Sequence, residues 1–358
     1  MILSKTNTII FMVIAACSIA GCYDQHPHTS AGMDASVPMT DTSIPVMELD
    51  LRVELASTNP AGSIISPNAS SVALASFSFT AGVDDVTITA LRVHRVGVGA
   101  GSDFANVFLR DANGTRLTVG RAINSQTNVI AFNNVNLGIP AGQARSFVLV
   151  GDMASPAITG GQHSFQITDA TSVDANVVVS GDFPVAGNTI TVGSLQATRI
   201  DVRAADGLEH PDAQAQNAEI ARFTMTAGER DAVINSLTLL QAGSVSMNSI
   251  TNLQLYNESQ LVASTPSIQG DKIVFHLLAG TMVLAESIET FSLRADINAP
   301  AGRTIRIHSE YPTDVSATDV LLNGRASVCI DQTLVHCSGS LAGYNGINGE
   351  YSEVVLQP

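Results

Sequence analysis

The residues best suited to covalent chemistry are two cysteines near the C-terminal end of the chain. Cys329 and Cys337 have seven residues between them, and His336 directly precedes the second cysteine. If the protein is exported from the cell, an isolated pair at this spacing predicts a disulfide that closes a hairpin or a short loop. A Cys-His-Cys metal site is the alternative, but zinc requires a fourth ligand and reduced thiols. We therefore expect a disulfide here and no metal.

The segment 111–114 is the nearest approach to a calcium loop in this sequence. Asp111 and Asn113 offer the carboxylate and amide oxygens that calcium prefers as ligands. The remaining ligands of such a loop, including its distal glutamate, are missing. The Asn-Gly pair at 113–114 is also a strong signal for a tight hairpin turn. The segment therefore favours a turn, with calcium as the less favoured alternative.

The sequence contains no recognisable catalytic motif. It has no His-Glu-x-x-His metal pair and no Gly-x-Ser-x-Gly nucleophile elbow. The glycine-rich segment 97–101 joins two expected strands without a following helix, so it predicts a loop and not a dinucleotide site. We expect no enzyme and no cofactor; a hydrolase with an unrecognised pair of carboxylates is a third-ranked alternative. Five of the eight histidines are scattered over the predicted domains: His94, His163, His210, His276 and His308.

The composition favours strands over helices. Charged residues make up only 14% of the 358 residues, and the formal net charge is −15. β-branched and turn-forming residues are abundant, while the Lys/Glu ladders of exposed helices are absent. The acidic balance argues against nucleic acid as a partner, because phosphate binding requires clustered lysines and arginines.

Residues 1–21 have the features of a secretory signal peptide. Lys5 is their single charged residue, and the apolar run 9–16 is too short for a membrane-spanning helix, which needs about 20 residues. The segment ends in Ile19-Ala20-Gly21-Cys22, which resembles the lipobox of bacterial lipoproteins. That resemblance implies cleavage between Gly21 and Cys22 and attachment of diacylglyceryl and further acyl chains to Cys22.

Lipidation would make the bilayer itself a partner of the protein, because two or three acyl chains anchor a protein stably. Residue 23 is Tyr. The aspartate that retains lipoproteins at the inner membrane is therefore lacking there, and the resemblance implies the outer membrane. Residues 22–47 are polar and contain several prolines, so we expect a flexible tether.

The rest of the chain repeats itself. The phrase Phe-Ser-Phe-Thr-Ala-Gly at 77–82 returns as Phe-Thr-Met-Thr-Ala-Gly at 223–228, and Phe-Val-Leu-Val-Gly-Asp at 147–152 returns as Phe-Ser-Leu-Arg-Ala-Asp at 291–296. Matching segments in the same order, at nearly constant offset, predict two equivalent domains over 48–193 and 194–358.

Within each repeat, apolar and polar residues alternate, as in Val-Thr-Ile-Thr at 86–89. Glycine and proline turns, such as Pro-Ala-Gly at 140–142 and at 300–302, separate the alternating runs. This pattern predicts two tandem antiparallel β-sandwiches. The repeated phrases resemble immunoglobulin-like repeats of bacterial cell-surface proteins, which implies a spacer, scaffold or adhesive role.

We therefore expect a membrane-anchored, surface-displayed lipoprotein that acts as a non-enzymatic structural or adhesive module. Its further partner is expected to be an unidentified protein or polysaccharide. The alternative is an envelope-assembly scaffold that captures a protein partner on an exposed strand edge.

Overall fold

A computed structural model describes residues 50–330, 337 and 351–358 of the chain. These residues form strands, connecting turns and four short 3-10 turns. The described residues all belong to one compact unit. The predicted signal peptide and tether, with Gly21 and Cys22, lie outside the described residues. Within the described part, no helix has the length and apolar character needed to cross a bilayer.

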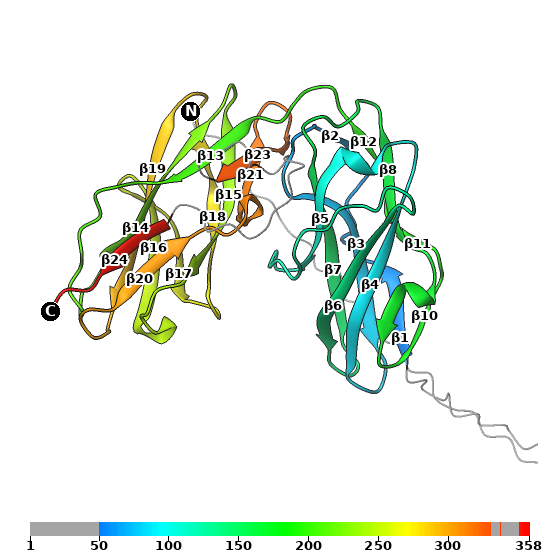
Figure 1. Cartoon of the computed structure of the whole chain (residues 1–358), viewed down its shortest axis with the longest axis horizontal. Coiled ribbons are helices and arrows are strands. Elements are labelled where there is room, and N and C mark those ends of the chain that lie inside the picture. Colours follow the sequence, from blue (N-terminus) through cyan, green and yellow to red (C-terminus); the bar gives the residue numbers. More distant parts are fainter. Residues whose placement is uncertain (1–49, 331–336, 338–350) are drawn as a thin grey trace, which may run out of the picture. The chain divides into compact units, whose positions relative to one another are not determined.

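The first sandwich consists of two sheets, and all of their strands except β9 are labelled in Figure 1. One sheet has the strand order β10 (Val178–Gly181), β1 (Asp50–Leu55), β3 (Val72–Ala81), β7 (Ala144–Met153) and β5 (Phe104–Asp111). The other has the order β2 (Ile64–Ile65), β12 (Ile190–Val192), β8 (Gln162–Ile167), β4 (Val86–Val96) and β6 (Val129–Ile139). Two short strands complete it: β9 (Val173–Ala175) pairs with β4, and β11 (Val185–Ala186) pairs with β8.

The second sandwich is built in the same way. One sheet has the order β17 (Gln260–Ser267), β16 (Ile250–Asn257), β19 (Ile288–Ile297), β14 (Ala218–Ala227), β13 (Arg199–Ala204) and β23 (Ser327–Ile330). The other has the order β22 (Gly324–Arg325), β21 (Val315–Asp319), β15 (Ala232–Gln241), β20 (Thr304–His308) and β24 (Tyr351–Val355), and β18 (Lys272–Val283) also pairs with β15.

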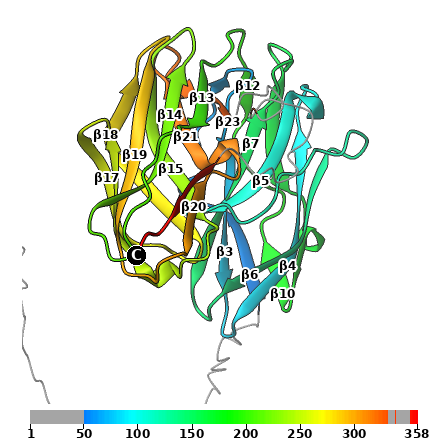
Figure 2. The same ribbon diagram turned by 60° about the vertical axis from the view of Figure 1, so that its left-hand side comes forward.

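The two sandwiches share their strand pairing. In the first, β3 pairs with β7 so that Phe77 lies opposite Phe147; in the second, β14 pairs with β19 so that Phe223 lies opposite Phe291. Figure 2 shows β14, β15 and β19 of the second sandwich from another side. Each sandwich has its own core of buried apolar side chains, one within residues 51–197 and one within 200–356. The predicted all-β fold of two antiparallel sandwiches is confirmed.

The alternating pattern explains which side chains enter these cores. In β4, Val86, Ile88, Leu91 and Val93 are all buried. The alternation slips once, because the pairing with β6 shifts register between Ile88 and Ala90. β15 of the second sandwich shows the same shift at the equivalent place, between Ile234 and Ser236. A β-bulge at this position is therefore a repeated feature that restores the inward direction of the next apolar residue.

Candidate functional site: an arginine pocket beside a bonded junction

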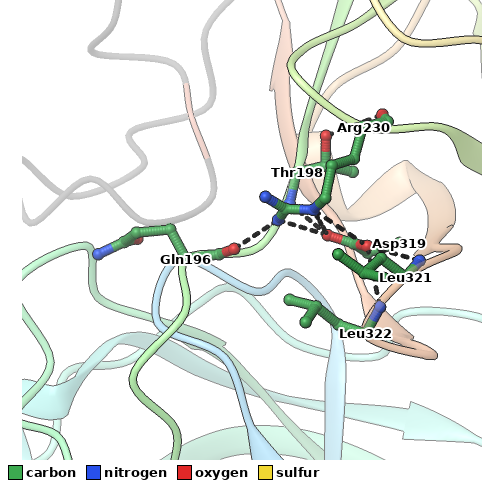
Figure 3. A network of polar contacts seen from close by, with 6 residues as sticks. All are labelled: Gln196, Thr198, Arg230, Asp319, Leu321 and Leu322. Atoms are coloured by element: carbon green, nitrogen blue, oxygen red, sulfur yellow. Dashed lines mark hydrogen bonds and ion pairs between the residues drawn. The ribbon is translucent and has the colours of Figure 1, made fainter.

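The chain passes from the first sandwich to the second through a segment that is held by a buried carboxylate (Figure 3). Asp319 at the end of β21 is completely buried and accepts a hydrogen bond from the backbone N–H of Thr198 at 2.8 Å. It also accepts backbone hydrogen bonds from residues 321 and 322, both at 3.1 Å. Arg230 pairs with the same carboxylate at 2.7 Å and donates to the carbonyl oxygen of Gln196 at 2.6 Å. One ion pair thus holds the C-terminal part of the connecting segment, at residues 196 and 198.

The electrostatics of this junction favour the charged forms. Burial alone raises the pKa of Asp319, but the hydrogen bonds from Arg230 and from the backbone outweigh it and hold the pKa below its usual value. The pKa of Arg230 is raised, mainly by its hydrogen bond to Asp319. The pair is therefore ionised near neutral pH.

A polar pocket of about 150 Å³ lies where the turn after β5 faces β15, β18, β21 and β22. We call Arg110, Arg116 and Arg325, which line it, the arginine cluster, and the cavity the arginine pocket. Lys272 and His276 of β18 also line its wall. Four residues with hydroxyl side chains also line the pocket: Ser236, Thr238, Thr313 and Ser316.

Aromatic rings position two of the three guanidinium groups. Arg116 lies over the ring of Phe108, 4.3 Å from its centroid, and over the ring of Tyr311, 4.0 Å from its centroid. Arg110 lies 5.2 Å from the centroid of Phe108. In such cation–π contacts the aromatic ring packs against the flat face of the guanidinium. The N–H groups lie in the plane of the guanidinium, so they remain available to donate hydrogen bonds.

The hydrogen bonds of the cluster go to hydroxyl and carbonyl oxygens. Arg110 donates to Ser71 Oγ at 3.2 Å and to the carbonyl oxygen of Thr313. Arg116 donates to the carbonyl oxygen of Thr118 and to Thr313 Oγ1, both at 2.8 Å. Arg325 donates to the hydroxyl of Ser316. Nε of Arg110 is buried without a hydrogen-bond partner.

No carboxylate among the described residues forms an ion pair with the cluster. Asp152 uses Oδ1 to accept the backbone N–H of Ser71 at 2.9 Å. Asp314 uses Oδ2 to accept the backbone N–H groups of Glu310 and Tyr311 at 3.0 and 2.8 Å. Asp314 lines the pocket and Asp152 does not, but the hydrogen bonds of both carboxylates come from backbone N–H groups.

Burial shifts the ionisation of these groups. It raises the pKa of Asp152 and that of Asp314 to about 6 each. It lowers the pKa of Arg110 to about 10, and the positive charges of Arg325 and Arg116 act in the same direction. At neutral pH the arginines remain protonated, so the lining of the pocket carries more positive than negative charge.

The predicted hairpin turn at 111–114 stands at the mouth of this pocket. Asp111 Oδ1 accepts the backbone N–H groups of Asn113 and Thr115 at 3.0 and 2.7 Å. Gly114 has a φ of +86°, which glycine adopts without strain. The Asp111 carboxylate therefore shapes the turn that brings Arg116 back beside Arg110. Among the described residues, no three His, Cys, Asp or Glu side chains gather as metal ligands.

A second polar cluster lies in the core of the first sandwich. Nε2 of His163 lies 3.1 Å from Oδ2 of Asp103, without the alignment of a good hydrogen bond. Nη1 of Arg95 lies 3.1 Å from Nδ1 of the same ring. Because a guanidinium only donates, Nδ1 must accept, and the ring proton belongs on Nε2, which faces Asp103. A Cβ at Gly99 would lie 2.2 Å from the ring, so the loop 97–101 packs closely on this cluster.

The sequence alone predicted neither the arginine cluster nor the group of His163, Asp103 and Arg95. It named His163 only as one of several scattered histidines and did not name the three arginines of the pocket. One feature of the sequence does point to the arginine pocket. The chain has only 17 lysines and arginines in 358 residues, and two of them, Arg110 and Arg116, stand on either side of the predicted turn at 111–114. The remaining histidines do not meet in one site: His94 contacts the carbonyl oxygen of Thr127, and His210 accepts the backbone N–H of Val355.

The structure joins Cys329 and Cys337 by a disulfide, with their Cα atoms 4.0 Å apart. Cys329 belongs to β23, which pairs with β13 at the sheet edge. His336, the third member of the alternative metal site, lies outside the described residues, as do Gly21 and Cys22.

No family model and no curated protein matches the chain. Among solved structures, it is similar to the major pilin subunit BcpA of Bacillus cereus, with 11% identity and a TM-score of 0.21 over 64% of this chain and 65% of that one. It is similar to a putative membrane anchored protein of Corynebacterium diphtheriae, with 11% identity and a TM-score of 0.17 over 86% of this chain and 57% of that one. For the collagen adhesin of S. aureus, the identity is 6% and the TM-score 0.15 over 87% and 95% of the two chains.

The chain thus spans 65% of the length of the pilin subunit. At TM-scores of 0.15 to 0.21, these similarities say nothing further about the fold or the function of the chain. The assignment of the fold therefore rests on the strand pairing of the chain itself.

Proposed function

We propose that this protein is a lipid-anchored, non-enzymatic module that is displayed on the outer membrane of a bacterial envelope and binds a protein or polysaccharide partner. The observation that carries the proposal is the order of parts along the chain. The lipobox-like sequence ends at Cys22, a polar segment follows to residue 47, and two equivalent sandwiches come next. That order suits a module held off a membrane surface.

The physical basis of the anchor is the burial of acyl chains. Each buried methylene contributes about 0.8 kcal/mol, so two or three chains bind a bilayer far more tightly than one. The acidic net charge of −15 would not hold the protein on anionic lipid, so the acyl chains must do so.

Mass spectrometry of the N-terminal peptide of the protein purified from membranes tests the anchor. The expected product begins at Cys22 and carries diacylglyceryl. Cys22→Ser should leave the protein unprocessed and unlipidated, whereas Cys17→Ser, the matched control, should be processed normally. An unmodified N-terminus, or a leader that stays attached to the wild-type protein, would refute the proposal.

The adhesive role is tested separately, on intact cells that display the protein. Saturable binding of those cells to an array of envelope polysaccharides and surface proteins is expected, and cells with the Cys22→Ser variant should lose it. If displaying and non-displaying cells bind the array equally, the adhesive role is wrong even when the anchor is right.

One observation favours a second function, the capture of a protein strand during envelope assembly. Within the described residues, β17 pairs only with β16, and β18 only with β15, so each leaves an unpaired edge (Figure 2). A groove of about 470 Å³ lies between these edges. Leu261 and Met282 line it, and each is 49% exposed. An incoming strand would gain both backbone hydrogen bonds and apolar contacts there.

Crosslinking in intact cells tests this second function. Leu261→Lys and Met282→Lys should abolish a crosslink to a dominant envelope protein. Val98→Lys is the matched control, because Val98 is 84% exposed in a loop of the first sandwich. Loss of the crosslink in the control as well, or its persistence in both edge variants, would exclude the groove as the capture site.

A further inference from the structure

We propose that the arginine pocket binds an oxyanion group, that is, a phosphate, sulfate or carboxylate. This inference is independent of the lipid anchor and of the β17/β18 edge, and it stands whether or not Cys22 is acylated. It assigns a ligand chemistry to a cavity that no sequence motif marks.

Positive charge is concentrated in this cavity although the chain as a whole is acidic. The chain has 17 lysines and arginines against 32 aspartates and glutamates. Nevertheless, three arginines and one lysine line a single cavity of about 150 Å³, and Asp314 is the one acidic residue in that lining. Positive charges that line one cavity repel one another, and the low dielectric of a protein interior strengthens this repulsion. An anion in the cavity would remove that repulsion.

The arginine cluster also has hydrogen-bond donors that no protein oxygen uses. A guanidinium has five N–H donors, so the cluster has about fifteen in all. Five hydrogen bonds to protein oxygens account for part of this number. Nε of Arg110 is buried and has no partner, and an unsatisfied buried donor costs about 1–3 kcal/mol. The planar N–H edges match the oxygens of carboxylate, sulfate and phosphate.

The nearby carboxylates do not take the place of the anion. Asp152, Asp314 and Asp111 each direct oxygens at backbone N–H groups. Glu310, His276 and Tyr311 are the remaining titratable groups near the cluster. The two buried carboxylates reduce the positive field of the pocket without occupying its donors.

Residues with hydroxyl side chains form part of the wall of the arginine pocket. Ser236, Thr238, Thr313 and Ser316 present hydroxyl groups beside the cluster. Hydroxyls donate to anionic oxygens without adding charge, and a water molecule occupies about 30 Å³ in the liquid. The cavity is therefore large enough for one oxyanion group together with bridging water.

Isothermal titration of the purified full chain with sodium sulfate, sodium phosphate or sodium acetate, at an ionic strength matched with sodium chloride, tests the site. Saturable binding at a ratio of one is expected. Lys272→Gln and Arg325→Gln should each weaken binding by about tenfold. Arg92→Gln is the matched control, because Arg92 forms an exposed ion pair with Asp174 and lies outside the pocket. Its affinity should equal that of the wild type.

Thermal unfolding gives a second readout that a purely structural arginine would not produce. Without an oxyanion, Arg325→Gln should melt at or above the wild-type temperature, because the substitution removes repulsion within the cluster. In saturating sulfate the wild type should melt higher than the variant. If Arg325→Gln does not fold, Lys272→Gln carries the same comparison, since Lys272 is only partly buried.

A sulfated polysaccharide in place of free sulfate distinguishes the source of the group. If the polysaccharide binds more tightly than free sulfate, and Lys272→Gln loses this advantage, the site recognises a polymer. If the affinity per sulfate group is equal for the two ligands, the site binds small ions. Binding no stronger than that of chloride, or equal binding by the wild type and both pocket variants, would overturn the proposal.

Discussion

Nε2 of His163 lies 3.1 Å from Oδ2 of Asp103, and the two side chains are 0% and 1% exposed. The ring of Phe104 packs edge-on against the imidazole at a centroid distance of 4.8 Å. Burial lowers the pKa of His163 to about 4 and outweighs the opposing attraction of Asp103. The imidazole is therefore neutral in the folded protein at pH 7.

This ionisation makes the contribution of His163 to stability depend on pH. The unfolded chain binds a proton at this residue below about pH 6.5, whereas the folded protein does so only near pH 4. The wild type therefore loses stability from this group as the pH falls from 6.5 to 4. The free-energy cost of His163→Gln should be largest above pH 6.5 and should shrink toward pH 4. Urea unfolding of the wild type and of His163→Gln at several pH values measures this free-energy cost, and His94→Gln is the control. A cost that grows as the pH falls would contradict the neutral imidazole in the folded protein.

Asp152 should show the opposite trend. Its pKa is raised from 3.8 to about 6, so the folded protein gains stability from protonation as the pH falls from 6 to 3.8. Asp152→Asn lacks this gain, and its destabilisation should grow by about 2–3 kcal/mol between pH 7 and pH 4. Asp296→Asn is the control, because Asp296 accepts the N–H of Asn217 as Asp152 accepts that of Ser71. Parallel curves for both variants would refute the burial effect.

The junction carboxylate should be the most sensitive charged residue of the chain. Asp319→Ala removes the partner of Arg230 and leaves three backbone N–H groups without their acceptor. Breaking a buried ion pair costs about 3–5 kcal/mol. Glu54→Gln, which breaks the exposed pair with Arg52, should cost no more than about 1 kcal/mol. Urea unfolding measures both losses, and similar values for the two variants would show that burial does not decide the difference.

The disulfide is expected to stabilise the end of β23. Closing a loop with a sequence separation of 8 contributes about 2–3 kcal/mol in the chain-entropy account. Cys329→Ser combined with Cys337→Ser should therefore lower the free energy of unfolding by that amount. Wild-type protein kept in a reductant should match the double variant in urea. An unchanged midpoint in both would indicate that the bond adds no stability.

Binding of sulfate to the arginine pocket should strengthen as the pH falls from 7.5 to 5.5. Asp152 and Asp314 have pKa values raised to about 6, so acidification removes negative charge near the cluster. Sulfate keeps its charge over this range, which makes it a better probe than phosphate. Isothermal titration at three pH values measures the change. Asp152→Asn should flatten the dependence, and weaker binding at low pH would contradict the electrostatic account.

Local patterns in the sequence determined the class of fold. Period-two alternation in segments such as 86–89 predicts strands because successive side chains of a strand point to opposite faces. The Asn-Gly pair at 113–114 predicted a turn, and of the two residues Gly114 alone has the left-handed backbone that glycine adopts without strain. The repeated phrases at 77–82 and 223–228 predicted two equivalent sandwiches, since equal patterns bury equal faces.

The tertiary structure alone decided which polar residues meet. Arg110 and Thr313 are 203 residues apart in sequence but share a hydrogen bond, and Asp103 lies beside His163 because β8 and the start of β5 approach the same end of the first sandwich. Such contacts depend on sheet order and register, which no short segment contains. Strand formation is a property of neighbours in sequence, whereas a cluster of charges is a property of neighbours in space.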